Sequence, residues 1–250
     1  MTVDEIATVV RGAHVQHHRL MVTEKDAEGF YRPVGVLGAP TAGQYTFHYL
    51  RSAVARPGFR PFLGFSDTGR SYRSDGLFPL FAERIMDPRR PEHPMYLAAL
   101  DLSGDVTPLE VLARSGGQRA GDGIMLLPIP EVAADGSTHA TFLVHGMRHV
   151  PGADERVGRL CVGDALFLRP DPDNWTNARA VLVVEGDDQP LGYVPDVLLD
   201  FVHSVDDVRL SVVRVNGPEV GSRLRLLVRL EGQADPDEQP FTGDAWETVD

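Results

Sequence analysis

Three histidines close together, His14, His17 and His18, are the first candidates for chemistry in this chain. If this segment is helical, His14 and His18 share one face at positions i and i+4, a spacing that two metal-binding imidazoles can use. However, no glutamate stands between them as in a His-Glu-x-x-His zinc motif, and a third ligand is not evident. We therefore expect surface histidines, with a metal pair as the alternative, and we predict no cofactor.

Motifs of nucleophilic and nucleotide-dependent catalysis are missing from the sequence. No Gly-x-Ser-x-Gly or Ser-x-x-Lys pattern offers a serine nucleophile. The glycines from Gly35 to Gly43 lack the Gly-Lys-Ser/Thr ending of a phosphate-binding loop. The single cysteine, Cys161, precedes an apolar run and is expected to be a small core side chain. We predict a binding protein, and an enzyme with an unrecognised site is the alternative.

Arginines and aromatic residues alternate in a stretch rich in glycine and proline. The arginines are Arg51, Arg56, Arg60, Arg70 and Arg73, and the aromatic residues are Phe59, Phe62, Phe65 and Tyr72. Such a mixture suits single-stranded nucleic acid, through phosphate contacts and base stacking. It also suits a protein interface, where the same residue types are enriched. An ordinary surface loop is the third reading, because every basic residue except Lys25 is an arginine.

The charge of the chain is unevenly distributed. Its formal net charge is −12 over 250 residues, and an acidic protein is repelled at long range by nucleic acid and by anionic membranes. The tail from residue 231 to 250 has acids and no base, whereas residues 51–90 have more arginines than acids. We therefore expect a local basic face that can bind phosphate, without extensive coating of DNA.

The sequence contains neither a membrane-spanning segment nor a signal peptide, and these two features predict where the protein is located. No apolar run approaches the roughly 18–20 residues that span a bilayer. The first ten residues, MTVDEIATVV, have acids where a signal peptide has basic residues. A cytoplasmic location and no membrane partner are expected.

Residues 1–130 are predicted to form a mixed β-sheet with short helices. Apolar and turn residues place strands at 33–38, 45–50 and 124–129, and helices at 6–10, 77–86, 94–100 and 107–115. The last helix has the clearest start: Thr107 is a cap, Pro108 stands at the first helical position, and Glu110 completes a capping box.

Residues 141–231 are predicted to form a small β-barrel with one helix. Strands are expected at 141–144, 165–168, 180–184, 191–194, 208–215 and 224–230, and the helix at 197–202. The composition of residues 131–140 indicates a linker, and residues 232–250 form an acidic tail. The fold class is therefore α+β, with two domains.

Four motifs in the second half occur in a recognisable order. They are the segments 142–149 (FLVHGMRH), 162–168 (VGDALFL), 171–181 (DPDNWTNARAV) and 191–195 (LGYVP). In order and spacing they resemble the HIRAN domain, a small β-rich module of DNA-repair and chromatin-remodelling proteins. The resemblance implies a pocket for the 3′ end of single-stranded DNA, made by an arginine–aromatic pair and an Asn-Pro-Tyr-Asp loop.

The resemblance also implies the binding residues. They are Arg148, His149, Asn174, Trp175, Asn177 and Tyr193. Arg148 and Asn174 keep the residue types of the family, while His149 and Trp175 offer flat rings on which a base can stack. The tyrosine and aspartate of the family loop are replaced here by Thr176 and Asn177, which removes a carboxylate acceptor for a terminal 3′-hydroxyl.

The first half has a resemblance of its own. The segments 45–49 (YTFHY), 77–84 (LFPLFAER) and 116–119 (GGQR) are similar to the N-terminal segment of HipA-type toxin kinases. In that family a kinase domain follows, whereas here a HIRAN-like domain stands in its place. The order of the whole chain resembles bacterial stand-alone HIRAN-containing proteins.

These patterns together predict a non-enzymatic protein that binds single-stranded DNA or DNA 3′ ends, in DNA repair or defence. The alternative is a protein-interaction or regulatory module of a toxin–antitoxin-like system, with a protein partner. The acidic surface and tail suit that alternative.

Overall fold

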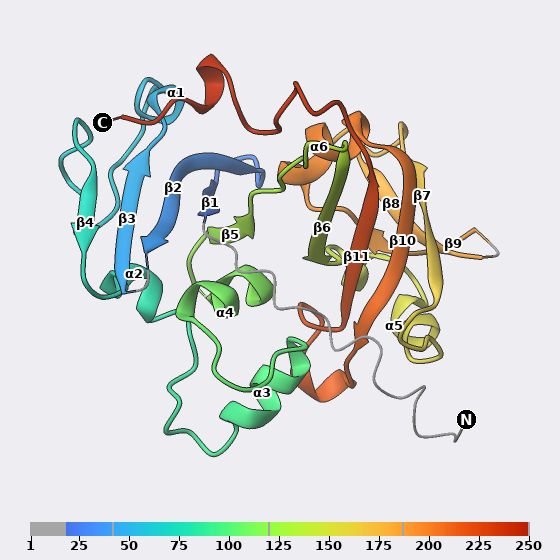
Figure 1. Ribbon diagram of the computed structural model, residues 1–250. Helices are drawn as coiled ribbons and strands as arrows, with labels where there is room; N and C mark the ends of the chain where they lie inside the picture. Colours follow the sequence, from blue (N-terminus) through green and yellow to red (C-terminus); the bar gives the residue numbers. More distant parts are fainter. Residues whose placement is uncertain (1–18, 42, 120, 187, 250) are drawn as a thin grey trace.

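The computed structural model describes residues 19–41, 43–119, 121–186 and 188–249 (Figure 1). The candidate metal pair at His14 and His18, together with His17 and the helix expected at 6–10, lies outside the described residues. Within the described part of the chain, no helix is long and apolar enough to cross a membrane.

The described part of the first half contains a five-stranded sheet and four short α-helices. The strands are β1 (Arg19–Lys25), β2 (Tyr31–Thr41), β3 (Gln44–Tyr49), β4 (Tyr72–Ser74) and β5 (Ile124–Pro128), in the order β4-β3-β2-β1-β5. The helices are α1 (Arg51–Val54), α2 (Pro79–Ala82), α3 (His93–Ala99) and α4 (Pro108–Ser115). All its strand pairs are antiparallel. The predicted mixed sheet is therefore wrong, because short hairpins join β1 to β2 and β2 to β3, and β5 returns antiparallel to β1.

The helices expected at 94–100 and 107–115 are confirmed as α3 and α4. The helix expected at 77–86 is wrong in length, since α2 covers only Pro79–Ala82. After α2 the backbone continues in tight turns, in which the N–H of Arg84 donates to the carbonyl of Phe81 and that of Ile85 to Ala82. The side chain of Arg84 reaches back to the carbonyl of Gly117, a tertiary contact that the local pattern does not encode.

The aromatic residues of the 51–73 loop form the core of the first half. Phe62, Phe65 and Tyr72 are buried around Phe47 and Tyr49, the inward-facing residues of β3. The hydroxyl of Tyr49 accepts the N–H of Phe62 at 2.7 Å and donates to the carbonyl of Phe65 at 3.1 Å. These buried rings therefore do not offer faces on which bases could stack.

The second half contains a six-stranded antiparallel sheet. Its strands are β6 (Ser137–Leu143), β7 (Ala165–Pro170), β8 (Val181–Glu185), β9 (Gln189–Tyr193), β10 (Asp206–Val215) and β11 (Leu226–Gln233), in the order β6-β11-β10-β7-β8-β9. The order leaves β6 and β9 as edges, and among the described residues an isolated bridge between His145 and Tyr193, beyond the end of β6, is the one β-bridge that connects these two edges. The α+β class is confirmed, whereas the predicted closed barrel is not.

Two helices, rather than the one predicted, accompany the second sheet. The expected helix at 197–202 is confirmed as a 3-10 turn (Asp196–Leu198) that continues into α6 (Leu199–Ser204). The additional helix is α5 (Ala153–Val157), which has only five residues. Such a segment is too short for a helical period to be read from the sequence.

The side-chain environment of Cys161 also differs from the prediction. The residue is exposed in the turn before β7. Its backbone N–H donates to the carboxylate of Asp164 at 2.7 Å, which fixes a polar turn at this point. The expected core position is therefore wrong, because Val162 and Phe167 of the same apolar run are exposed as well and only Leu166 is buried.

The two halves pack against each other around one hydrophobic cluster. Met21, Leu50 and Met125 from the first half belong to the same cluster as Phe142 and Phe201 from the second. Figure 1 shows the two sheets side by side, with the segment after β11 crossing back toward β3. The proposed domain boundaries, the linker at 131–140 and the tail at 232–250 stay predictions.

The segment after β11 is hydrogen-bonded to the first half. The N–H of Val249 donates to the carbonyl of Tyr49 at 2.8 Å, and the N–H of Arg51 donates to the carbonyl of Glu247 at 2.8 Å. Residues far apart in the sequence thus join beside β3, which holds the two halves together at a second place.

Candidate functional site

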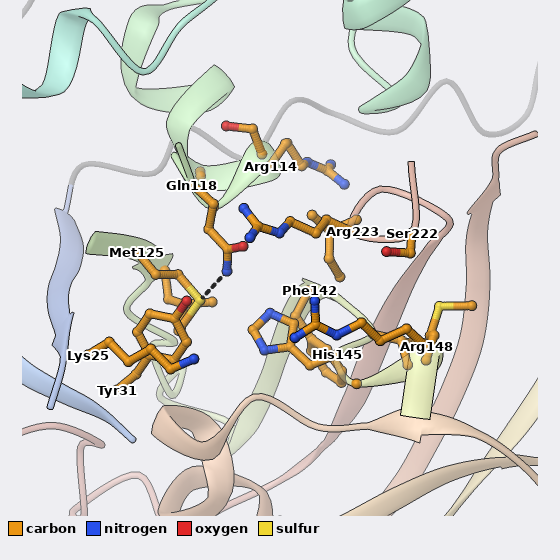
Figure 2. A pocket seen from close by; sticks show the side chains of 18 of the residues that line it. Lys25, Tyr31, Arg114, Gln118, Met125, Phe142, His145, Arg148, Ser222 and Arg223 are labelled. Atoms are coloured by element: carbon orange, nitrogen blue, oxygen red, sulfur yellow. Dashed lines mark hydrogen bonds between the residues drawn. The ribbon is translucent and has the colours of Figure 1, made fainter. Parts of the chain in front are cut away.

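A cavity of about 210 Å³ lies between the two halves. Its first wall comes from the ends of β1, β2 and α4 and from β5. Its second wall comes from the end of β6, the turn after it, and the loop before β11. The polar residues that Figure 2 labels around it are Lys25, Tyr31, Arg114, Gln118, His145, Arg148, Ser222 and Arg223. We call this cavity the interdomain pocket.

The interdomain pocket is strongly cationic. Lys25, Arg114, Arg148 and Arg223 line it, and the described residues of its lining include no aspartate or glutamate. Within the described ranges, none of these four side chains forms an ion pair. Since like charges gathered in a concave site focus a positive potential, the pocket attracts anions.

Arg114 is the most enclosed of these cations. It lies in the last turn of α4, a helix fixed at its start by the capping box of Thr107 and Glu110 and at its end by Gly116 with a φ of 70°. The Nη1 atom of Arg114 is buried without a hydrogen-bond partner in the described part of the chain. Burial lowers the pKa of Arg114, and nearby Asp101 opposes that shift.

His145 and His149 stand on the second wall of the pocket. Part of the surface of His145 is exposed to the pocket, yet burial, together with the charge of Arg223, lowers its pKa to about 4. His145 is therefore neutral at physiological pH. Arg148 donates from Nε to Nε2 of His149 at 2.9 Å, so this arginine–imidazole pair is preorganised.

A second group of residues surrounds the loop after β7. Asp171 accepts hydrogen bonds at Oδ2 from the Tyr193 hydroxyl at 3.0 Å and from Nδ2 of Asn174 at 3.2 Å. Burial raises the pKa of Tyr193, and the carboxylate of Asp171 raises it further. The side-chain oxygen of Asn174 accepts the backbone N–H groups of Thr176 and Asn177. We call Asp171, Asn174 and Tyr193 the loop cluster.

The remaining loop residues have contrasting roles. Asn177 donates from Nδ2 to Asp196 at 3.0 Å and so connects the loop to the 3-10 turn before α6. Trp175, in contrast, is 95% exposed at the tip of the loop. A fully exposed tryptophan buries no apolar surface for the fold, so it is available to a ligand.

The six residues implied by the family resemblance thus fall into two adjoining groups. Arg148 and His149 line the interdomain pocket, whereas the other four, Asn174, Trp175, Asn177 and Tyr193, belong to the loop cluster or its neighbourhood. Gly146 joins the groups, because a Cβ atom there would lie 3.0 Å from Cδ2 of Tyr193.

The predicted basic patch does not contribute to the pocket lining. Arg51 lies 3.6 Å from Glu247, and Arg56 donates to the carbonyl of Pro33. Arg70 lies 3.7 Å from Asp67 and stands over the ring of Tyr72. Arg60 and Arg73 are exposed.

The sequence interpretation missed several residues of the site. Asp171 opens one of the four recognised motifs, so its position was a usable signal for a carboxylate near Tyr193. Lys25, Arg114 and Arg223 carried no local signal, because they come from three distant segments that only the fold brings together.

Two solved structures are similar to part of this chain. A protein from Lactobacillus plantarum has 20% identity over 40% of this chain and 100% of its own, with a TM-score of 0.31. The HIRAN domain of human HLTF has 13% identity over 44% of this chain and 86% of its own, with a TM-score of 0.30. No curated protein matches.

The resemblance of the first half to HipA-type kinases stays a prediction.

The family model of the HIRAN domain matches residues 138–230, which run from β6 to β11. The chain therefore contains a HIRAN domain at residues 138–230.

Proposed function

We propose that this chain is a non-enzymatic protein that binds single-stranded DNA, including its 3′ end, through the HIRAN domain. The observation that supports the proposal best is the family match, in which Arg148 of the matched segment lines a cationic pocket. We also propose that the protein acts in the cytoplasm, in DNA repair or defence.

Three side chains have suitable chemistry for a strand end. Arg148 supplies a guanidinium for a backbone phosphate. Trp175 supplies an exposed ring for base stacking. Asp171 supplies a carboxylate beside Tyr193 whose Oδ1 has no hydrogen bond to the described residues, and it can accept a terminal 3′-hydroxyl. Asp171 would thereby supply the carboxylate acceptor that is lost where Asn177 replaces the aspartate of the family loop.

The overall charge limits the form of binding. With a net charge of −12, the chain is repelled by duplex DNA except where its cations lie together. Binding should therefore be confined to a short strand segment, and it should weaken as salt is added, because each neutralised phosphate releases counterions.

The experiment compares three fluorescein-labelled oligonucleotides by anisotropy: a single strand with a 3′-hydroxyl, the same strand with a blocked 3′ end, and a blunt duplex. The 3′-hydroxyl strand should bind most tightly, and higher salt should weaken it. Negligible and equal affinity for all three probes would contradict the proposal.

Substitutions then locate the binding surface. Arg148→Ala and Trp175→Ala should each weaken binding by roughly tenfold, the effect of one lost phosphate contact or one lost stacked base. Arg209→Ala is the matched control for the exposed arginine. Leu63→Ala is the control for the tryptophan, because Leu63 is 94% exposed and lies in the other half. Both controls should bind as the parent protein does.

A further inference from the structure

The interdomain pocket has a wall that the HIRAN domain does not supply. Lys25, Tyr31, Arg114 and Gln118 lie outside the matched residues 138–230. They face Arg148 and Arg223, which lie inside the matched segment (Figure 2). Residues of both halves are therefore needed to form the pocket.

Charge is the first indication of a ligand. Four cations surround about 210 Å³ of space whose lining, among the residues that the structure describes, has no carboxylate. The side chains of Lys25, Arg148 and Arg223 are exposed. An anion with several oxygens would accept hydrogen bonds from these three cations and offset the repulsion among all four.

The neutral groups of the pocket narrow the class of anion. Tyr31 and Ser222 add hydroxyls to the lining. The side-chain amide of Gln118 donates to the sulfur of Met125 at 3.1 Å. Because a thioether sulfur is a weak acceptor, a ligand oxygen can replace it as the partner of Gln118. Phe142 and Leu127 supply an apolar side. The lining therefore suits a ligand with a charged head and a less polar body.

The size of the pocket agrees with this description. A water molecule occupies roughly 30 Å³ in the liquid, so the cavity of about 210 Å³ is too large for a single small ion. It has room for a tetrahedral oxyanion together with part of the group to which it is attached.

We propose that the interdomain pocket binds a phosphate monoester, the group shared by a free mononucleotide and the phosphorylated end of a nucleic-acid strand. The cations surround the phosphate oxygens, and the attached sugar or base lies toward Phe142 and Leu127. This site goes beyond the proposed DNA binding, because a free nucleotide occupies it whether or not the chain binds a strand.

The test measures binding of thymidine monophosphate and thymidine to the full chain by isothermal titration calorimetry. Thymidine monophosphate should bind and thymidine should not. Lys25→Gln and Arg223→Gln, at exposed side chains whose loss leaves the core intact, should each weaken binding by about tenfold or more. Arg209→Gln, an exposed arginine outside the pocket lining, should leave it unchanged.

A second arm identifies the source of the phosphate. Oligonucleotides with a 5′-phosphate, a 3′-phosphate or hydroxyl ends compete with thymidine monophosphate. Competition that requires a terminal phosphate and is lost in Arg223→Gln assigns the site to strand ends, and its absence, with the nucleotide still bound, assigns it to free nucleotides.

The proposal is overturned if no probe gains affinity from its phosphate, or if Arg209→Gln weakens binding as much as Arg223→Gln does. The DNA experiment uses strands without a terminal phosphate and depends on Trp175, whereas this one uses a mononucleotide and depends on Lys25. Each proposal can therefore fail while the other stands.

Discussion

His145 and Tyr193 are joined by two backbone hydrogen bonds. The N–H of His145 donates to the carbonyl of Tyr193 at 2.9 Å, and the N–H of Tyr193 donates to the carbonyl of His145 at 2.8 Å. His145 lines the interdomain pocket, while the hydroxyl of Tyr193 binds Asp171 in the loop cluster. This backbone pair therefore sets the position of one candidate binding group relative to the other.

Replacing Gly192 should separate this pair. A Cβ atom at Gly192 would lie 2.5 Å from the carbonyl oxygen of His145 and 2.6 Å from Cγ1 of Val144. Gly192→Ala should therefore lower the free energy of unfolding by about 2 kcal/mol, as overpacking does. Urea denaturation measures this change. Gly186→Ala is the control, since a Cβ there meets nothing within 4 Å, and an equal loss in the two variants would refute the explanation.

The capping box of α4 should contribute measurably to stability. The side chain of Thr107 accepts the N–H of Glu110 at 3.3 Å, and Glu110 accepts the N–H of Thr107 at 2.7 Å. Thr107→Ala should cost about 1 kcal/mol in thermal or urea unfolding. Thr107→Ser keeps the hydroxyl and should retain most of that stability, so a serine variant as unstable as the alanine variant would argue against the cap.

Sequence patterns predicted correctly those elements that depend on neighbouring residues. The cap at Thr107 and the strand at 45–50 were predicted from a few neighbouring residues, and the structure confirms them as the start of α4 and as β3. The glycine of the Leu191–Pro195 motif has a physical reason, because Gly192 has no room for a side chain.

Other features depend on tertiary contacts and could not be read locally. Strand β1 was not predicted. Its apolar run is short and follows a histidine-rich stretch, so neither the helical period nor the alternation of a strand was apparent there. The composition of the 51–73 loop did not reveal that Phe62 and Phe65 point inward. Likewise, Lys25 and Arg223 meet at one pocket only because the two halves pack together.

His145 should make stability depend on pH. The unfolded chain binds a proton at this imidazole near the ordinary pKa of 6.5, whereas the folded protein does so only near 4. The unfolded state therefore holds more protons between these values, and stability falls as the pH is lowered from about 6.5 toward 4.

The measurement is the urea midpoint at pH 7 and at pH 5. His145→Gln should reduce the difference between the two midpoints. His203→Gln, at an exposed histidine, is the control and should retain the difference of the parent protein. If His145→Gln retains it as well, His145 is not its source.

The ion pair of Arg84 and Asp122 should stabilise the end of α4. The Arg84 side chain is 2% exposed and lies 2.6 Å from the Asp122 carboxylate, while its Nη1 also donates to the carbonyl of Gly117. Asp122→Asn should cost about 2 kcal/mol, less than for a fully buried pair because Asp122 is 35% exposed. Asp105→Asn, at an exposed carboxylate, should cost little.

The same pair predicts a pH effect in the acid range. Burial raises the pKa of Asp122, but the hydrogen bonds and charge of Arg84 outweigh it, so the net pKa lies below the ordinary 3.8. Its contribution is present above that value and is lost as the pH falls through the lowered pKa. Between pH 5 and pH 3 the parent protein should therefore lose more stability than Asp122→Asn, and an equal loss would contradict the assignment.

The most direct measurement of the proposed DNA binding uses the two tryptophans of the chain as separate probes. Trp175 is 95% exposed beside the loop cluster, whereas Trp246 packs against Phe241 at a ring distance of 4.8 Å. Indole ¹⁵N–¹H signals, assigned with Trp175→Phe, are followed while a 3′-hydroxyl single strand is added. A saturable shift of the Trp175 signal that exceeds any shift of Trp246 is expected, and in Arg148→Ala the same shift should need roughly tenfold more strand. A Trp175 signal that stays unchanged, or one that saturates at the same strand concentration in Arg148→Ala, would contradict the proposed DNA binding.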